Sequence, residues 1–124
     1  MNNNKNALVL AYIGDSIYET YIREYLISKG ICKVKELQSA SIKYVSATSQ
    51  AHFLKLMLDN NFLTEEEIKI VMNARNHKNN HKPKHTDIIT YKYATALEAL
   101  IGYLYFNKKV DRIEEIIDFI KKEN

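Results

Sequence analysis

Glycine and proline are scarce in this chain, and their scarcity limits the fold more than any other feature of the sequence. Three glycines and one proline occur among 124 residues, whereas these two residues make up roughly 12% of an average protein. A fold of many short strands needs frequent tight turns, which depend on glycine and proline. The sequence therefore predicts an all-α fold, and the many isoleucines do not change this, because propensity alone is a weak guide.

The length and composition are those of a single globular domain. The chain is 46% apolar and 27% charged, and single domains most often have about 100–150 residues. The lone cysteine, Cys32, excludes an internal disulfide and a multi-cysteine zinc site. The start of the chain is polar, and Gly14 and Asp15 interrupt the first apolar segment, which argues against an export signal and a membrane span. We expect one domain, residues 1–124, in the cytoplasm.

Apolar residues at helical spacing, together with capping residues, predict a bundle of helices. Thr64 and Glu67 form a capping box that marks the start of one helix. Gly30 suits the left-handed position that follows a helix end, and the tyrosines at helical spacing predict packing in the core and in interfaces. The one proline lies in an exposed loop over 79–86. The expected helices cover 7–28, 41–61, 64 to about 75–78, 86 or 87 to 106, and a last one capped by Asp111, with a short segment at 34–38.

Two acidic residues stand on helix faces that are otherwise mostly apolar. Asp15 has Ala11 and Ile22 at helical spacing in the first helix. Glu98 is the one formally charged side chain between residues 93 and 107. Burying an unpaired carboxylate costs several kcal/mol, so each of these acids needs a cation, a metal ion or a shifted pKa.

A glycine accompanies each of these acids. Gly14 precedes Asp15, and Gly102 follows Glu98 by one helical turn. An interior glycine costs a helix about 1 kcal/mol relative to alanine, and a close crossing of two helices would explain that cost. Such a crossing would bring Asp15 and Glu98 together. Two facing carboxylates form an oxygen site that suits Mg²⁺.

An alternative without a metal stays open for the two acids. Each carboxylate can pair with a basic side chain inside the core, and Arg23 and Lys92 are the candidates. Both basic residues lie near the ends of the expected helices. Because two acids each adjoin an interior glycine, the sequence favours the metal site.

Basic residues are concentrated in the segment between Glu67 and Asp87. This segment contains no acid, five lysine or arginine residues and three histidines. Such side chains contact phosphates, sugar hydroxyls and base edges of RNA, although a solvated, lysine-rich loop is an equally good interpretation. A metal site made of the three histidines is not favoured, because Pro83 interrupts the helix that it would need. The candidate RNA-binding residues are Arg75, Asn76, Lys78, His81, Lys82, Lys84 and His85.

Several segments resemble the ribonuclease III catalytic domain, in the form that is found in Mini-ribonuclease III. Its two signature helices are similar to AYIGDSIYE at 11–19 and YATALEALIGYLY at 93–105. Three further segments follow the family's order and spacing, namely VSATSQA at 45–51, ARN at 74–76 and KHTDIITYKY at 84–93. The resemblance therefore covers nearly the whole chain.

This resemblance implies an all-helical, homodimeric endoribonuclease that cleaves double-stranded RNA with the help of Mg²⁺. Asp15 and Glu98 match motif positions of the family's catalytic, metal-ligating acids. The resemblance also implies products with 5′-phosphates and, as substrate, a precursor of the large-subunit (23S) ribosomal RNA. It implies no separate double-stranded-RNA-binding domain.

The set of acids is smaller than in full-length ribonuclease III. Leu8 and Ala11 stand where the longer enzymes have acids before the Gly-Asp pair, and Thr95 stands in place of an Asp. This reduced set resembles the Mini form. We expect Glu19 and Thr95 to support the site, and the alternative for Glu19 is a salt bridge with Arg23 four residues later.

Two functions of other classes fit the same sequence. A non-catalytic helical module that binds RNA or a ribosomal partner would keep the two acids paired inside its core. A helical regulator would use the basic loop on duplex DNA. The net charge of only +3 predicts that binding to any nucleic acid is weak and strongly dependent on salt.

Overall fold

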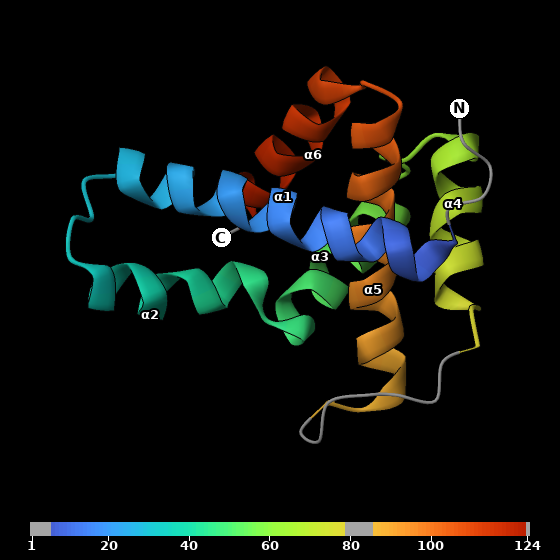
Figure 1. The fold of residues 1–124 in the computed structure, drawn as a ribbon, viewed down its shortest axis with the longest axis horizontal. Helices are drawn as coiled ribbons and strands as arrows, with labels where there is room; N and C mark the ends of the chain where they lie inside the picture. Colours follow the sequence, from blue (N-terminus) through green and yellow to red (C-terminus); the bar gives the residue numbers. More distant parts are fainter. Residues whose placement is uncertain (1–5, 79–85, 124) are drawn as a thin grey trace.

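The computed structural model describes residues 6–78 and 86–123 of the chain. These residues form six α-helices and no β-strand (Figure 1), which confirms the all-α prediction. None of these helices combines the length and the apolar character that a membrane-spanning segment needs. The helices are α1 (Ala7–Ser28), α2 (Val34–Val45), α3 (Ala47–Asp59), α4 (Glu65–Arg75), α5 (Ile88–Phe106) and α6 (Val110–Lys122).

Side-chain caps fix where α1, α4 and α5 begin. The carboxamide of Asn6 accepts hydrogen bonds from the first backbone amides of α1. Thr64 and Glu67 form the predicted capping box at the start of α4. Asp87, one of the two caps considered for α5, accepts a hydrogen bond of 2.8 Å from the backbone amide of Thr90. These caps satisfy amides that have no partner within the helix.

Two predicted boundaries are wrong. The sequence predicts a short element at 34–38 and one long helix over 41–61, whereas α2 and α3 are separate helices of similar length that meet at Ser46. Ser46 has an extended backbone (φ −63°, ψ 153°), and its hydroxyl accepts a hydrogen bond from the amide of Ser49. The chain therefore turns at this cap although the apolar spacing continues. At the other end of the chain, α6 begins before Asp111, which lies in its first turn.

Helix α5 occupies the centre of the bundle. It contacts α1, α3, α4 and α6, and Figure 1 shows α1 crossing it. Leu97, Leu100 and Ile101 on α5 are fully buried, and burying each such side chain contributes roughly 1.5–3 kcal/mol. Because neighbours surround α5, its sequence from Tyr93 to Phe106 is apolar on nearly all sides, and Glu98, the one charged side chain of that stretch, lies close to other helices.

Helices α1 and α5 cross at the two interior glycines. A β-carbon on Gly14 would overlap the backbone oxygen of Glu98, and a β-carbon on Gly102 would overlap the backbone oxygen of Leu10. The helices approach this closely because neither position carries a side chain. The crossing that the sequence predicts is therefore confirmed.

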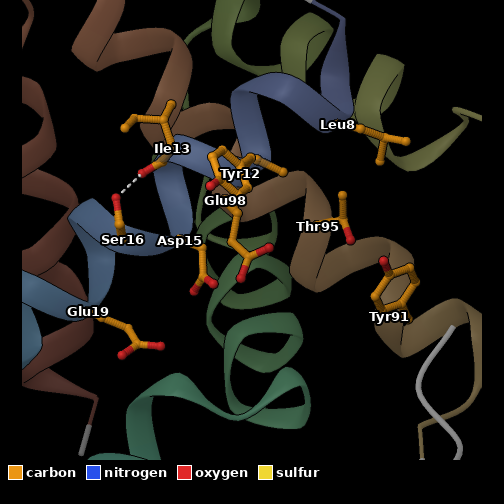
Figure 2. A pocket seen from close by; sticks show the side chains of 10 residues that line it. Leu8, Tyr12, Ile13, Asp15, Ser16, Glu19, Tyr91, Thr95 and Glu98 are labelled. Atoms are coloured by element: carbon orange, nitrogen blue, oxygen red, sulfur yellow. Dashed lines mark hydrogen bonds between the residues drawn. The ribbon is translucent and has the colours of Figure 1, made fainter.

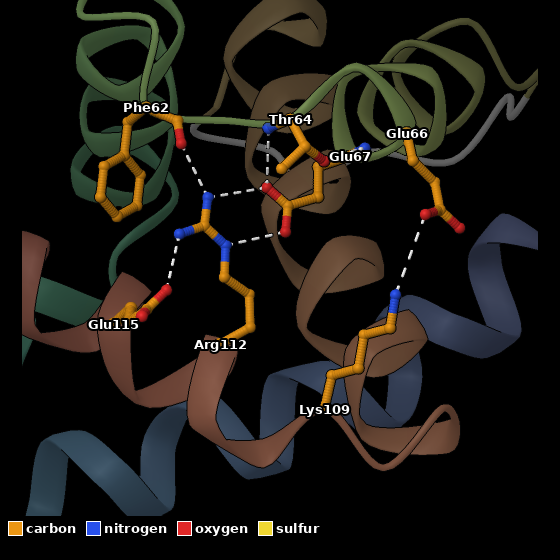
Figure 3. A network of polar contacts seen from close by, with 7 residues as sticks. All are labelled: Phe62, Thr64, Glu66, Glu67, Lys109, Arg112 and Glu115. Atoms are coloured by element: carbon orange, nitrogen blue, oxygen red, sulfur yellow. Dashed lines mark hydrogen bonds and ion pairs between the residues drawn. The ribbon is translucent and has the colours of Figure 1, made fainter.

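A partly buried ion pair joins α6 to α4 (Figure 3). The guanidinium of Arg112 donates two hydrogen bonds of 2.8 Å to the carboxylate of Glu67, and one of 2.7 Å to the backbone oxygen of Phe62. Burial alone would raise the pKa of Glu67, but hydrogen bonds from Arg112 and Thr64 hold it below its usual value. Glu67 therefore caps α4 and fixes α6 at the same time.

Candidate active site

Asp15 on α1 and Glu98 on α5 point toward one another at the helix crossing (Figure 2). The close backbone approach at Gly14 and Gly102 brings the two carboxyl groups within hydrogen-bonding distance of each other. Both acids line one cleft of about 820 Å³ between α1 and α5. The structure thus brings together the two acids that the sequence singles out.

Burial and nearby negative charges raise the pKa values of both carboxyl groups. Burial, followed by the charge of Asp15 and the hydrogen bond to it, raises the pKa of Glu98 to about 8. Burial and the charge of Glu19 raise the pKa of Asp15, while the hydrogen bond from Glu98 lowers it. With a pKa of about 8, Glu98 is mostly protonated at pH 7, and a protonated carboxyl group can donate a hydrogen bond to its neighbour Asp15.

No lysine or arginine neutralises this pair within residues 6–78 and 86–123, where neither acid forms an ion pair. Arg23, one of the two candidate partners, instead lies 3.0 Å from the carboxylate of Glu19. Lys92, the other candidate, forms no ion pair with either acid within these ranges. The alternative in which Asp15 and Glu98 each pair with Arg23 or Lys92 inside the core therefore does not describe the residues that the structure covers.

The two expected supporting residues also line the cleft (Figure 2). Thr95 is 6% exposed and lies one turn before Glu98. Glu19 lies one turn after Asp15, and its ion pair with Arg23 shows that the structural alternative for this residue is also present. The rest of the cleft wall is largely apolar or aromatic, and is formed by Leu8, Ala11, Tyr12, Ile13, Ser16 and Tyr91.

The candidate RNA-binding residues lie outside this cleft where the structure describes them. Arg75 is held in place, because its guanidinium donates to the Asn76 side chain at 2.9 and 3.1 Å and to the Tyr93 hydroxyl at 3.3 Å. Asn76 and Lys78 are exposed. The remaining candidates fall outside the described residues: His81, Lys82, Lys84 and His85.

Gln50 on α3 is a polar residue of the site that the sequence analysis missed. Only 2% of this residue is exposed. Its carboxamide lies within hydrogen-bonding reach of the Glu98 carboxyl group and lowers the pKa of that group, against the larger effect of burial. Gln50 belongs to the VSATSQA segment at 45–51 that resembles the family, but its contact with Glu98 joins residues far apart in the chain, so the segment alone does not reveal this role.

The groups in the cleft fit a hard divalent cation. Two carboxyl groups supply oxygen ligands of the kind that Mg²⁺ prefers, and water and substrate oxygens commonly complete its shell. No cluster of three or more histidine, cysteine, aspartate or glutamate side chains suited to a metal occurs in the described part of the chain. The Asp15 and Glu98 pair is thus the candidate ligand set.

Comparisons with known proteins agree on one family. The sequence profile of the ribonuclease III domain matches residues 8–109. Mini-ribonuclease 3 proteins of Enterococcus faecalis and Brevibacillus brevis are 43% and 46% identical over 95% and 93% of this chain, and over 89% and 84% of their own lengths. A Fusobacterium nucleatum protein with a crystal structure is 35% identical and superposes with a TM-score of 0.87, covering 97% of this chain and 96% of that one. The chain therefore belongs to the ribonuclease III domain family, within the Mini-ribonuclease 3 group of endoribonucleases.

Proposed function

We propose that this protein is a Mg²⁺-dependent endoribonuclease that cleaves both strands of double-stranded RNA. The observation that carries the proposal is the meeting of the Asp15 and Glu98 carboxyl groups, without a basic partner in the described residues, at the crossing of α1 and α5. Membership of the ribonuclease III domain family supports it, because it makes the chain an enzyme that cuts RNA internally.

In this proposal Asp15 and Glu98 hold the metal ion. Magnesium, when bound, makes water more acidic and stabilises negative charge on the leaving 3′ oxygen of a phosphodiester, so that the products carry 5′-phosphates. Glu98 must lose its proton before it can act as a ligand, because metal ligands bind in their deprotonated form. The apolar residues of the cleft wall, such as Ala11 and Ile13, limit the water around the two acids.

We also propose that the active form is a homodimer. Tyr12 is 84% exposed and Val9 is 47% exposed on α1, and Ile88 and Ile89 are 37% and 61% exposed at the start of α5. Such exposed apolar side chains favour contact with a second chain, and Tyr12 also lines the cleft. A two-fold axis would place one cleft on each strand of an RNA duplex.

The proposed substrate is a precursor of the large-subunit (23S) ribosomal RNA, which is processed in the cytoplasm. Resemblance to Mini-ribonuclease III supports this choice. A-form RNA displays a wide minor groove with 2′-hydroxyl groups, so we expect the protein to recognise duplex shape. We expect Lys78 and the other basic residues of the segment before Asp87 to contact phosphates.

Incubation of the purified protein with duplex RNA, with and without Mg²⁺, tests the proposal directly. We expect cleavage only with the ion, and 5′-phosphates that make the products sensitive to a 5′-phosphate-dependent exonuclease. Asp15→Asn and, separately, Glu98→Gln should abolish cleavage and leave helicity and duplex-RNA binding intact. Asp59→Asn, at an exposed position on α3, is the matched control and should cleave normally.

The same variants separate the proposal from its alternatives. If Asp15→Asn and Glu98→Gln both unfold, and the wild-type protein binds RNA without cleaving it, the protein is a binding module. Competition between duplex RNA and duplex DNA distinguishes a DNA-binding regulator. Mapping the ends of 23S ribosomal RNA in cells that lack the protein tests the precursor as substrate, because its unprocessed ends should then accumulate.

A further inference from the structure

The side chain of Gln50 is anchored at the junction of α2 and α3. Its Nε2 atom donates a hydrogen bond of 3.1 Å to the backbone oxygen of Val45, the last residue of α2. The backbone amide of Gln50 donates to the oxygen of Ser46, the residue that caps α3. With 2% of the residue exposed, the carboxamide has little freedom to rotate.

The same carboxamide contacts Glu98 on α5. A carboxamide nitrogen carries two hydrogens, so Nε2 can serve both Val45 and Glu98. Helix α3 packs against α5, and this packing places the Gln50 carboxamide within hydrogen-bonding reach of the Glu98 carboxyl group. Glu98 is therefore held between Asp15 on α1 and Gln50 on α3.

The Oε1 atom of Gln50 is buried and has no hydrogen-bond partner among the described residues. Buried polar atoms in folded proteins are nearly always paired, so an unpaired one needs an explanation. Side chains that ligate metals are commonly oriented by a second layer of hydrogen-bonding groups. A water molecule bound to a cation between Asp15 and Glu98 would be a donor for this acceptor.

We propose that Gln50 is a positioning residue of the metal site. Its Nε2 atom orients the Glu98 carboxylate, and its Oε1 atom accepts a hydrogen bond from water in the coordination shell of the ion. This inference rests on the proposed function, because it requires Asp15 and Glu98 to hold the metal.

The Gln50→Met variant tests the inference, since methionine fills a similar volume and neither donates nor accepts strongly. We expect Mn²⁺ affinity to fall about 10-fold, measured by electron paramagnetic resonance on the full-length protein with a duplex RNA that resists cleavage. The Mg²⁺ concentration that gives half-maximal cleavage should rise by the same factor. Cleavage should recover at saturating Mg²⁺, and metal-free RNA affinity should not change. Gln38→Met, at an exposed position on α2, is the matched control and should behave as wild type.

A second variant covers the case in which methionine disturbs the core. Gln50→Asn keeps the amide but is one methylene shorter, so its amide no longer reaches Glu98, and we expect the same shift in metal affinity. Unchanged Mn²⁺ affinity in the folded variants overturns the inference. The inference is also overturned if a variant has a lower melting temperature and its cleavage stays low at saturating Mg²⁺, because that result indicates a structural role for Gln50. If the wild-type protein itself neither binds Mn²⁺ nor cleaves RNA, the proposed function fails, which is a different outcome.

Discussion

At the scale of single residues, Glu98 couples protonation to stability and to metal binding. Burial and the nearby charge of Asp15 raise the pKa of Glu98 to about 8. In the unfolded chain this carboxyl group ionises at its ordinary, lower pKa, so between the two values the folded state holds a proton that the unfolded state has lost. The free energy of unfolding therefore falls as pH rises through this window. Metal binding has the opposite dependence, because it needs the ionised carboxylate.

This coupling gives a prediction for Glu98→Gln. Without a metal, the wild-type protein should lose stability between about pH 5 and pH 8, and the variant should lose much less, because glutamine does not titrate. At about 1.4 kcal/mol per unit of pKa shift, the difference at pH 8 should reach a few kcal/mol in favour of the variant. Urea unfolding across this pH range, in the presence of a chelator, measures it. If the free energy of unfolding changed equally with pH in the wild-type protein and in Glu98→Gln, the proposed effect of Glu98 protonation on stability would be wrong.

Cleavage by the wild-type protein should show the reverse pH dependence at limiting Mg²⁺. Activity should rise as pH approaches about 8, because a larger share of Glu98 is then ionised and able to ligate. Initial rates at fixed, subsaturating Mg²⁺ measure this effect. Raising the Mg²⁺ concentration should move the midpoint of the profile to lower pH, since the ion competes with the proton. A midpoint that does not respond to Mg²⁺ would argue against Glu98 as a ligand.

At the scale of helices, the crossing of α1 and α5 depends on two positions that lack a β-carbon. We expect Gly14→Ala to force the helices apart, because its β-carbon would overlap the Glu98 backbone oxygen. Overpacking of this kind costs about 1–3 kcal/mol or more, which exceeds the gain of about 1 kcal/mol in helix propensity. Cleavage should be lost, because the two acids would separate.

Gly30→Ala is the comparison variant for this prediction. Gly30 has a positive φ of 93°, and nothing lies within 4 Å of a β-carbon placed there. Its substitution should therefore cost only the strain of the left-handed backbone and should preserve cleavage. Urea unfolding and RNA cleavage of both variants measure the difference. Equal effects of the two substitutions would show that the crossing does not need a glycine.

The attachment of α6 depends on the ion pair between Glu67 and Arg112. In Arg112→Leu the Glu67 carboxylate, whose side chain is 7% exposed, would lose its basic partner, and breaking such a pair costs about 3–5 kcal/mol. Because the pKa of Glu67 is held below its usual value, the contribution of the pair should be lost as pH falls through the carboxyl range. Thermal unfolding at neutral and acidic pH measures both effects. In the double variant Arg112→Leu/Glu67→Gln, part of the lost stability should return, because no unpaired carboxylate then remains at position 67.

At the scale of the whole molecule, the proposed dimer requires the exposed apolar surface of α1. Tyr12→Asp should shift the protein to a monomer, because it would place a charge in the contact, and double-strand cleavage should fall at least 10-fold. Light scattering coupled to gel filtration measures the mass. Tyr105→Asp, at a 47% exposed position near the end of α5, is the control. A dimer that persists in Tyr12→Asp would place the interface elsewhere.

The modest net charge of +3 sets the expected response of the whole molecule to salt. Binding to duplex RNA releases counterions in proportion to the phosphates that are neutralised. We therefore expect both binding and cleavage to weaken markedly between low and moderate salt. Filter binding and initial rates over a salt series measure this dependence. A flat response would show that the basic residues near Lys78 do not contact phosphates.

The sequence by itself determined the all-α class, most helix starts and the prominence of Asp15 and Glu98. These features depend on residues close together in the chain, such as the Thr64 cap and the neighbouring Gly14, and local chemistry leaves a pattern that can be read directly. Only the tertiary structure decided which side chains surround Glu98. Gln50 reaches it from α3, and α3 itself begins where Ser46 ends the preceding helix. Such contacts depend on how distant segments pack, and a one-dimensional pattern does not contain those distances.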